Sequence, residues 1–227
     1  MNILTIIAHP DDEILGCVGT IRKLTDEGYS VYSCMLCSLA DARHNRPQLK
    51  KFQQGVRRAE KEIGIKVTHR HEFKNIQFNA IPHIKIVKVI EKAIVKFKPE
   101  WIFTHHPGDV NIDHRICYEA AMSAIRLPQR LTQDMSPTTI KKVFLFEIPS
   151  STDWNSPVDL PFQPNCFFDI KKTLSNKLDA LKHCAGALKS FPHPRSIENI
   201  KALANLRGAQ SGIEVAEAFC LIRDLNC

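Results

Sequence analysis

The first half of the chain alternates short apolar runs with longer segments in which apolar residues recur at helical spacing. Segment 82–97 shows the helical pattern, because Ile84, Val87 and Ile90 fall on one face. Strands that alternate with helices favour parallel pairing and right-handed crossovers. The sequence therefore predicts an α/β fold, a Rossmann-like open and mostly parallel sheet with helices on both faces. The expected strands are 2–8, 30–37, 66–71 and 100–104, and the expected helices are 13–27, 48–63, 82–97 and 112–125.

The second half of the chain has a less regular pattern. Segment 213–225 fits a strand or a helix, with a strand favoured through 218–222. The other expected elements are a strand at 140–148, a loop at 149–163, and helices at 171–189 and 196–205. No internal repeat or linker divides the sequence, and a chain of 227 residues suits one α/β domain. We therefore expect residues 1–227 to form a single domain.

Composition and charge narrow the class of protein. The chain is 44% hydrophobic and 24% charged, which is ordinary for a globular protein. It has no apolar run of about 18 residues and no basic, apolar signal peptide, so we expect a cytoplasmic protein without a membrane span. The net charge is +7, but Lys and Arg are scattered and are not interleaved with aromatic residues. We therefore expect an anionic small substrate and no nucleic-acid partner.

The most informative segment is His9-Pro10-Asp11-Asp12-Glu13, which follows the first apolar run directly. Three carboxylates this close raise one another's pKa unless a positive charge offsets them, and a divalent metal does so. The helix that begins near Glu13 adds to this effect, because its N-terminus favours anions. The alternative is a capped helix, in which Asp11 or Asp12 caps the first turn and His9 has no function.

The second cluster is segment 105–115, which holds three His and two Asp beyond the fourth expected strand. Such sheets bind ligands beyond the carboxyl ends of their parallel strands, and both clusters fall on that edge. One His of this cluster, together with His9 and one Asp, provides the three protein ligands of a catalytic zinc site. His114 lies near the start of a helix, from which it can point back over the sheet edge. The alternative is a polar loop followed by a capped helix.

The two motifs His9-Pro10-Asp11-Asp12-Glu13 and Asn111-Ile112-Asp113-His114 together resemble those of the PIG-L/LmbE family of zinc-dependent N-deacetylases. In that family the motifs read His-Pro-Asp-Asp-Glu and His-x-Asp-His. The resemblance extends over most of the chain. It implies a hydrolase that removes an acetyl group from an N-acetylated sugar by zinc-activated water, with one zinc ion per chain. Iron(II) is an alternative metal, because it competes for such N/O sites.

The resemblance assigns roles residue by residue. His9, Asp12 and His114 match the metal ligands. Asp11 matches the general base that accepts the proton of the water. Asp113 matches the acidic residue of the second motif, which lies behind the ligands.

Asn111 departs from the family pattern, because many members carry a His at this position. An Asn can donate a hydrogen bond to an oxyanion, but it cannot act as an acid near pH 7. We therefore expect Asn111 to assist catalysis as a hydrogen-bond donor. The general acid is left unassigned among His105, His106 and reprotonated Asp11.

The implied substrate is an acetamido sugar, and the positive net charge favours a nucleotide-linked or otherwise anionic glycan precursor. Arg43 lies beyond the second strand on the expected ligand edge, and His193 and Arg195 lie in a stiff turn rich in Pro. We predict that these three residues bind substrate. The alternatives are a solvated loop Arg and a rigid surface turn. The oligomeric state is left open, a homo-oligomer included.

Two other classes of protein fit parts of the pattern. A metal-dependent phosphoesterase would use the same Asp and His cluster. A non-catalytic Rossmann-type binding protein would share the fold. Its dinucleotide-binding form is disfavoured, because no Gly-x-Gly-x-x-Gly turn follows the first strand.

Overall fold

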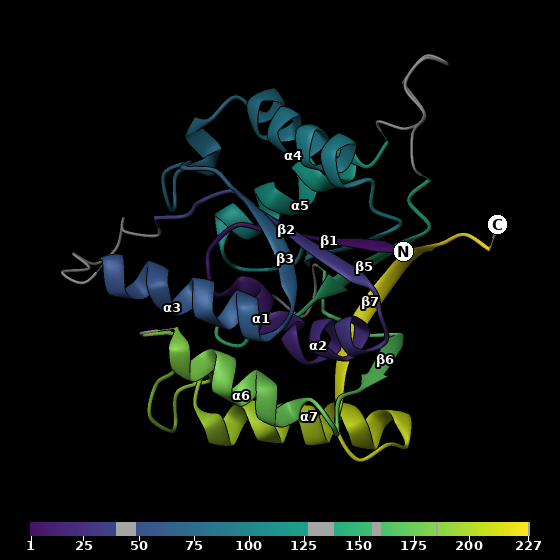
Figure 1. Ribbon diagram of the computed structural model, residues 1–227. Coiled ribbons are helices and arrows are strands. Elements are labelled where there is room, and N and C mark those ends of the chain that lie inside the picture. Colours follow the sequence, from purple (N-terminus) through teal and green to yellow (C-terminus); the bar gives the residue numbers. More distant parts are fainter. Residues whose placement is uncertain (40–48, 127–138, 156–159, 185, 227) are drawn as a thin grey trace.

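The strands of the computed structural model, which describes residues 1–39, 49–126, 139–155, 160–184 and 186–226, form one sheet (Figure 1). They are β1 (Asn2–Ile7), β2 (Ser30–Met35), β3 (Ile65–Arg70), β4 (Trp101–His105), β5 (Lys142–Phe146), β6 (Cys166–Asp169) and β7 (Ala216–Asp224). Their spatial order is β3-β2-β1-β4-β5-β7-β6. The first five are parallel, whereas β7 is antiparallel to both of its neighbours. The predicted mostly parallel α/β sheet is therefore confirmed.

Helices cover both faces of this sheet, as predicted (Figure 1). They are α1 (Asp12–Gly16), α2 (Val18–Asp26), α3 (Leu49–Glu62), α4 (His83–Phe97), α5 (Ile112–Ala124), α6 (Leu174–His183) and α7 (Ile197–Ser211). Helices α4 and α5 pack together on one face, and α1, α2 and α3 lie on the other. Helix α6 packs outside these three, and α7 packs against β6 and β7. The strand order reverses between β1 and β4, and such a switch point opens a crevice at the carboxyl ends of the strands.

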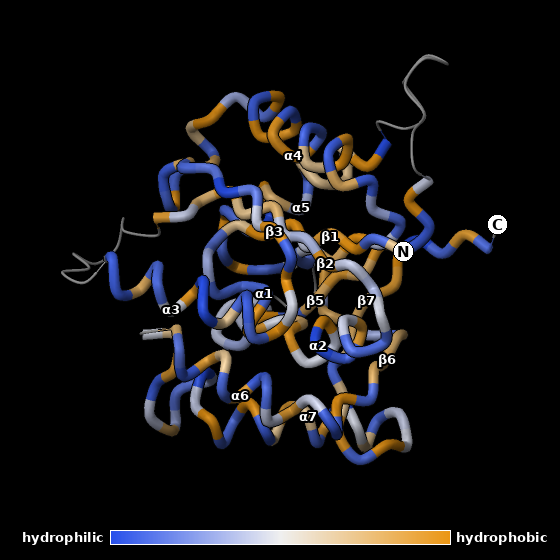
Figure 2. The backbone as a smooth tube through the Cα atoms, viewed as in Figure 1, coloured by the Kyte–Doolittle hydropathy of each residue, from blue (hydrophilic) through white to orange (hydrophobic). Residues whose placement is uncertain are grey.

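The core lies between the sheet and its helices, where hydrophobic residues are concentrated (Figure 2). Strand β1 is apolar along most of its length because helices cover it on both faces, and Ile3, Leu4 and Ile6 are fully buried. Helix α4 buries Val87 and Ile90 as its spacing predicts. Ile84 is exposed instead, because it lies in the first turn of the helix, beyond the packed face.

The expected helix 13–27 is divided at Cys17 into α1 and α2. A helix that breaks leaves backbone N–H and C=O groups without intrahelical partners. Two side chains from distant elements bind these groups. Lys177 of α6 donates to the Leu15 carbonyl over 2.8 Å. Glu217 of β7 accepts hydrogen bonds from the N–H groups of Gly19 and Thr20 at the start of α2.

The second half differs from expectation mainly at element ends. Segment 213–225 forms strand β7, as favoured. Helix α6 is shorter than the expected 171–189, and α7 continues beyond residue 205. The four residues of β6 were not expected to form a strand, and they pair with β7 alone among the described strands. Within the described residues, no helix is both long and apolar enough to span a membrane.

Candidate metal centre

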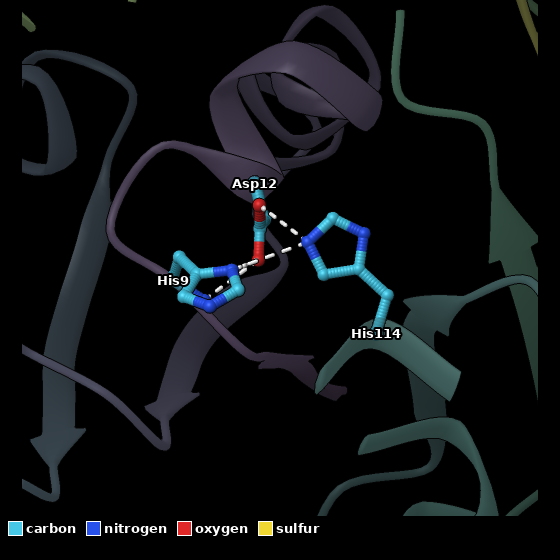
Figure 3. Close-up of side chains that lie close together, drawn as sticks. All are labelled: His9, Asp12 and His114. Atoms are coloured by element: carbon cyan, nitrogen blue, oxygen red, sulfur yellow. Dashed lines mark hydrogen bonds and ion pairs between the residues drawn. The ribbon is translucent and has the colours of Figure 1, made fainter. Parts of the chain in front are cut away.

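Three buried side chains converge at the switch point between β1 and β4 (Figure 3). His9 follows β1, Asp12 is the first residue of α1, and His114 lies in the first turn of α5. The β1 turn is tightened by a 2.6 Å hydrogen bond from the His9 N–H to Asp12 Oδ2. The two motifs, which are about a hundred residues apart in the sequence, are thus brought together as the strand arrangement predicts.

The spacing of the three side chains matches the first shell of a zinc ion. His9 Nδ1 lies 3.2 Å from His114 Nε2. Asp12 Oδ1 lies 3.4 Å from His114 Nε2, and Asp12 Oδ2 lies 3.5 Å from His9 Nδ1. Donor atoms about 2.0–2.1 Å from a tetrahedral zinc are about 3.3 Å apart. The donor set of two imidazoles and one carboxylate therefore fits zinc in both chemistry and spacing.

A carboxylate lies behind each of the two imidazoles. Asp113 Oδ2 lies 3.1 Å from His9 Nε2, and Asp109 Oδ2 lies 3.0 Å from His114 Nδ1. Metal-binding histidines commonly donate their second N–H to a carboxylate, which fixes the ring and its tautomer. His9 Nδ1 and His114 Nε2 are then left as lone-pair donors that face each other. This arrangement is typical of a metal site and has no function in a helix cap.

Backbone groups hold Asp113 in place. Its two oxygens accept hydrogen bonds from the N–H groups of Ile76 and Phe78, over 2.6 and 3.0 Å. Ile76 has a φ of +58°, a conformation that β-branched residues rarely adopt. Strained backbone of this kind persists where the surrounding structure requires it, and it clusters at functional sites. The backbone thus fixes Asp113 beside the His9 ring.

The electrostatics of the cluster also favour a cation. Burial lowers the pKa of His9, but Asp12 and Asp113 outweigh burial and raise it to about 10. Against burial, Asp12 and Asp109 raise the pKa of His114 to about 9. Burial raises the pKa of Asp12, yet the neighbouring histidines hold it well below its usual range. The two facing ring nitrogens, His9 Nδ1 and His114 Nε2, have room for only one proton between them. A metal ion bound by both nitrogens would replace that proton.

Asp11 lies next to the ligand set without belonging to it. It occupies the N-cap position of α1, but its carboxylate makes no hydrogen bond to the described α1 backbone. Instead, Asp11 Oδ2 lies 3.2 Å from Nη1 of Arg195. The Asp11 side chain is largely buried, with 12% of its surface exposed. The exposed part lies at the edge of the crevice. The capping alternative therefore does not account for Asp11.

The predicted substrate residues have different outcomes. Arg195 reaches the centre through Asp11. His193 Nδ1 accepts a hydrogen bond from the backbone N–H of Arg195, so both belong to one turn. Arg43 lies outside the described residues. Among the described residues, the structure therefore brings Arg195 into direct contact with Asp11 and places His193 in the same turn.

Asn111 caps helix α5, since its Oδ1 accepts a 3.0 Å hydrogen bond from the N–H of Asp113. The capped-helix alternative is correct for this residue. The cap uses the oxygen of the side-chain amide, so its NH₂ group is the part that suits an oxyanion.

His106 is held by a hydrogen bond from the Gly108 N–H to its Nδ1, and burial lowers the pKa of His106.

His105 lies deeper than the ligand set. Its Nε2 accepts a 3.0 Å hydrogen bond from the Ala8 N–H and lies 3.2 Å from Asp12 Oδ2. Its ring stacks on that of His114, with 4.2 Å between centroids. Burial, followed by the charge of His114, lowers the pKa of His105 to about 4. A fully buried, neutral imidazole is poorly suited to protonate a leaving amine, so this geometry disfavours His105 as the general acid.

A cavity of about 220 Å³ lies beside the metal centre and is lined in part by Pro10. Met35 and Arg70, at the ends of β2 and β3, form part of its wall, together with Arg57 of α3 and Glu72. This cavity was not predicted from the sequence. Part of its wall comes from the ends of β2 and β3, on the expected ligand edge. The rule that ligands bind beyond the carboxyl ends of parallel strands could therefore have indicated this cavity.

The family model described as "PIG-L: GlcNAc-PI de-N-acetylase" matches residues 4–125, which include both motifs. The chain belongs to this family. Its diacetylchitobiose deacetylase relative from Thermococcus kodakarensis is 27% identical over 200 residues, which are 80% of this chain and 68% of that protein. A probable N-acetyl-alpha-D-glucosaminyl L-malate deacetylase 2 from Bacillus cereus is 30% identical over 142 residues, 56% of this chain and 63% of that protein. These family relatives are deacetylases of sugar-related substrates.

The solved structure of N,N'-diacetylchitobiose deacetylase from Pyrococcus horikoshii superimposes on this member of the family with a TM-score of 0.77. The match covers 98% of this chain and 84% of that chain, at 18% sequence identity. At this identity the likeness shows the shared fold.

Proposed function

We propose that this chain is a zinc-dependent hydrolase that removes the acetyl group from an N-acetylated sugar. The observation that carries the proposal is the buried His9, Asp12 and His114 triad with a separate carboxylate, that of Asp11, beside it. Membership of the de-N-acetylase family and the activities of the relatives support the reaction. The position of His9, Asp11 and Asp12 after β1, and of His114 after β4, supports a shared site at one edge of the sheet.

Each residue of the site has a separate role in the proposed reaction. Zinc, when bound by the triad, lowers the pKa of a water to about 7 and so supplies a nucleophile at neutral pH. Asp11 accepts the proton that the water loses as its oxygen attacks the acetyl carbon. Asn111 donates a hydrogen bond from its NH₂ group to the carbonyl oxygen as negative charge develops there. Asp11 then returns the proton to the leaving amine, and the C–N bond breaks to give acetate and the free amino sugar.

The substrate is, in this proposal, a nucleotide-linked or otherwise anionic acetamido sugar. The net charge of +7 supports an anionic carrier, and the cavity beside Pro10 contains two arginines. Arg43, His193 and Arg195 are the substrate contacts predicted from the sequence; we propose Arg43 and His193 for this role, because the Arg195 guanidinium is already bound to Asp11. We further propose that residues 1–227 form a single domain and that the protein is cytoplasmic.

The proposal is tested by metal analysis of the purified protein together with a panel of N-acetylated sugars scored for released acetate. We expect about one zinc per chain and acetate release from at least one sugar, with none from His114→Ala. Release of phosphate from phosphorylated sugars without acetate would favour the phosphoesterase alternative. A protein that takes up no metal, and whose melting temperature zinc leaves unchanged, would favour the binding protein.

A further inference from the structure

Arg195 connects the turn between α6 and α7 to the first sequence motif. Its Nη1 lies 3.2 Å from Asp11 Oδ2, across a sequence separation of 184 residues. The same guanidinium donates from Nε to Ser150 Oγ over 2.7 Å and to the Pro149 carbonyl over 3.3 Å. The side chain is thus held at its middle by the loop after β5, and its tip points at Asp11.

The backbone on both sides of Arg195 is also fixed. Ser196 is fully buried and caps α7, accepting a hydrogen bond from the Asn199 N–H. The Asn199 side chain in turn donates to the Pro194 carbonyl over 2.7 Å. On the other side, the N–H of Arg195 is bound to His193 Nδ1. The guanidinium therefore has a rigid base from which to hold Asp11.

The partner loop is adapted to the same contact. Ser150, which anchors Arg195 Nε, has a φ of +75°, in the left-handed region that favours glycine. A non-glycine residue keeps this strained conformation only where neighbouring contacts hold it. An arginine that merely covered the surface would not need such an anchor. The contact with Ser150 thus indicates that the direction of the Arg195 side chain matters.

We propose that Arg195 is a positioning residue for Asp11, an inference that rests on the proposed function. Arg195 holds Oδ2 of the carboxylate, so that Oδ1 is presented to the water that loses its proton. A general base works only within hydrogen-bond reach of the proton that it accepts, and a rotated Asp11 carboxylate loses this reach. Arg195 therefore acts on the reaction through Asp11, before any contact with the substrate.

Kinetics separates this role from a purely structural one. Arg195 is 23% exposed and Asp11 is 12% exposed, so the pair is largely buried and its loss should lower the melting temperature somewhat. A purely structural role would leave kcat unchanged in the folded, zinc-loaded variant, whereas a positioning role lowers kcat.

The kinetic test compares the zinc-loaded wild-type protein with Arg195→Met and Arg195→Lys, using N-acetylglucosamine and diacetylchitobiose as probes. We expect Arg195→Met to lower kcat about 10- to 100-fold, with KM and zinc content nearly unchanged. Lysine has one charged nitrogen and cannot bind Ser150 and Asp11 together, so Arg195→Lys should recover only part of kcat. The matched control is Arg22→Met, which breaks a pair with Asp26 at the far end of α2.

Two kinetic results would overturn the proposal. They are a raised KM with unchanged kcat, which indicates a substrate contact, and unchanged values of both. A loss of zinc beyond that of the control would also overturn it, because the metal site itself would then be disturbed. Crystal structures of the wild type and Arg195→Met supply a readout that needs no activity. We expect the Asp11 carboxylate to change its rotamer in the variant, and an unchanged rotamer overturns the proposal. If the wild type releases no acetate, the proposed function fails, and these structures alone decide the role of Arg195.

Discussion

Asp109 Oδ2 lies 3.0 Å from His114 Nδ1, on the side of the ring opposite the nitrogen that faces His9. The same oxygen accepts 2.9 Å hydrogen bonds from the hydroxyl groups of Ser151 and Thr152. Two donors from the loop after β5 thus aim one carboxylate at the ring of one metal ligand. Asp109 belongs to the second sequence cluster, but no role was assigned to it from the sequence.

Asp109→Asn should weaken zinc binding about 10- to 100-fold, the usual effect of removing a carboxylate from behind a ligand histidine. The neutral amide no longer fixes the tautomer that leaves His114 Nε2 free for the metal. Competition with a chromophoric chelator measures the affinity. Asp153→Asn, a change in the same loop at an exposed position, is the control. An Asp109→Asn affinity equal to that of the control would show that Asp109 does not orient His114.

The zinc affinity of the metal-free protein should rise with pH. The pKa values of His9 and His114, raised to about 10 and about 9, mean that a proton occupies the site at neutral pH and competes with zinc. This competition weakens as pH rises toward those values and strengthens as pH falls. One displaced proton gives about a tenfold change in affinity per pH unit. Chelator competition at several pH values between about 6 and 8 measures this change in zinc affinity. A flat profile would contradict the displacement of a proton.

Asp11→Asn should retain zinc but lose most turnover. The amide keeps the size of the side chain and cannot accept a proton, so kcat should fall about 10²- to 10⁴-fold. Metal analysis and acetate release are measured on the same preparation. A variant with full activity would exclude Asp11 as the base, whereas a variant without zinc would make it a ligand.

The grouping of His9, Asp12 and His114 could be predicted because these residues lie close to strand ends in the sequence. His9 and Asp12 share one turn after β1, and His114 lies in the first turn of the helix that follows β4. The rule that parallel strands present their carboxyl ends at one edge then brings the motifs together. No side-chain contact had to be known in advance. This is why the fold and the grouping of these three side chains were accessible to sequence reasoning.

The contacts that orient the site were harder to predict from the sequence. They join distant segments, and neither segment carries a local sequence pattern that indicates the other. Arg195 was predicted to bind substrate from its stiff turn, but its contact with Asp11 depends on the packing of distant loops. The same holds for the break at Cys17, since the pattern of 13–27 is continuous. Strand β6 was missed because four residues carry too little periodicity, and its pairing with β7 defines it.

The break at Cys17 leads to a prediction about stability. Lys177 Nζ lies 2.7 Å from Glu217 Oε1, and both side chains are more than 90% buried. Breaking a buried pair by removing one partner leaves a buried charge, which typically costs about 3–5 kcal/mol. Lys177→Met should therefore lower the free energy of unfolding by about this amount, measured by urea denaturation of the zinc-loaded protein.

The double variant Lys177→Met with Glu217→Gln should recover part of that loss, because the neutral amide still accepts a hydrogen bond at the start of α2 and carries no unpaired charge. The control is Lys171→Met, which breaks the exposed pair with Glu214 and should leave the unfolding curve unchanged. Additive losses in the double variant would show that the two side chains act independently. Helix α1 carries Asp12, and Lys177 binds the Leu15 carbonyl one residue before this helix ends at Gly16, so Lys177→Met should also weaken zinc binding if the pair holds the break in place.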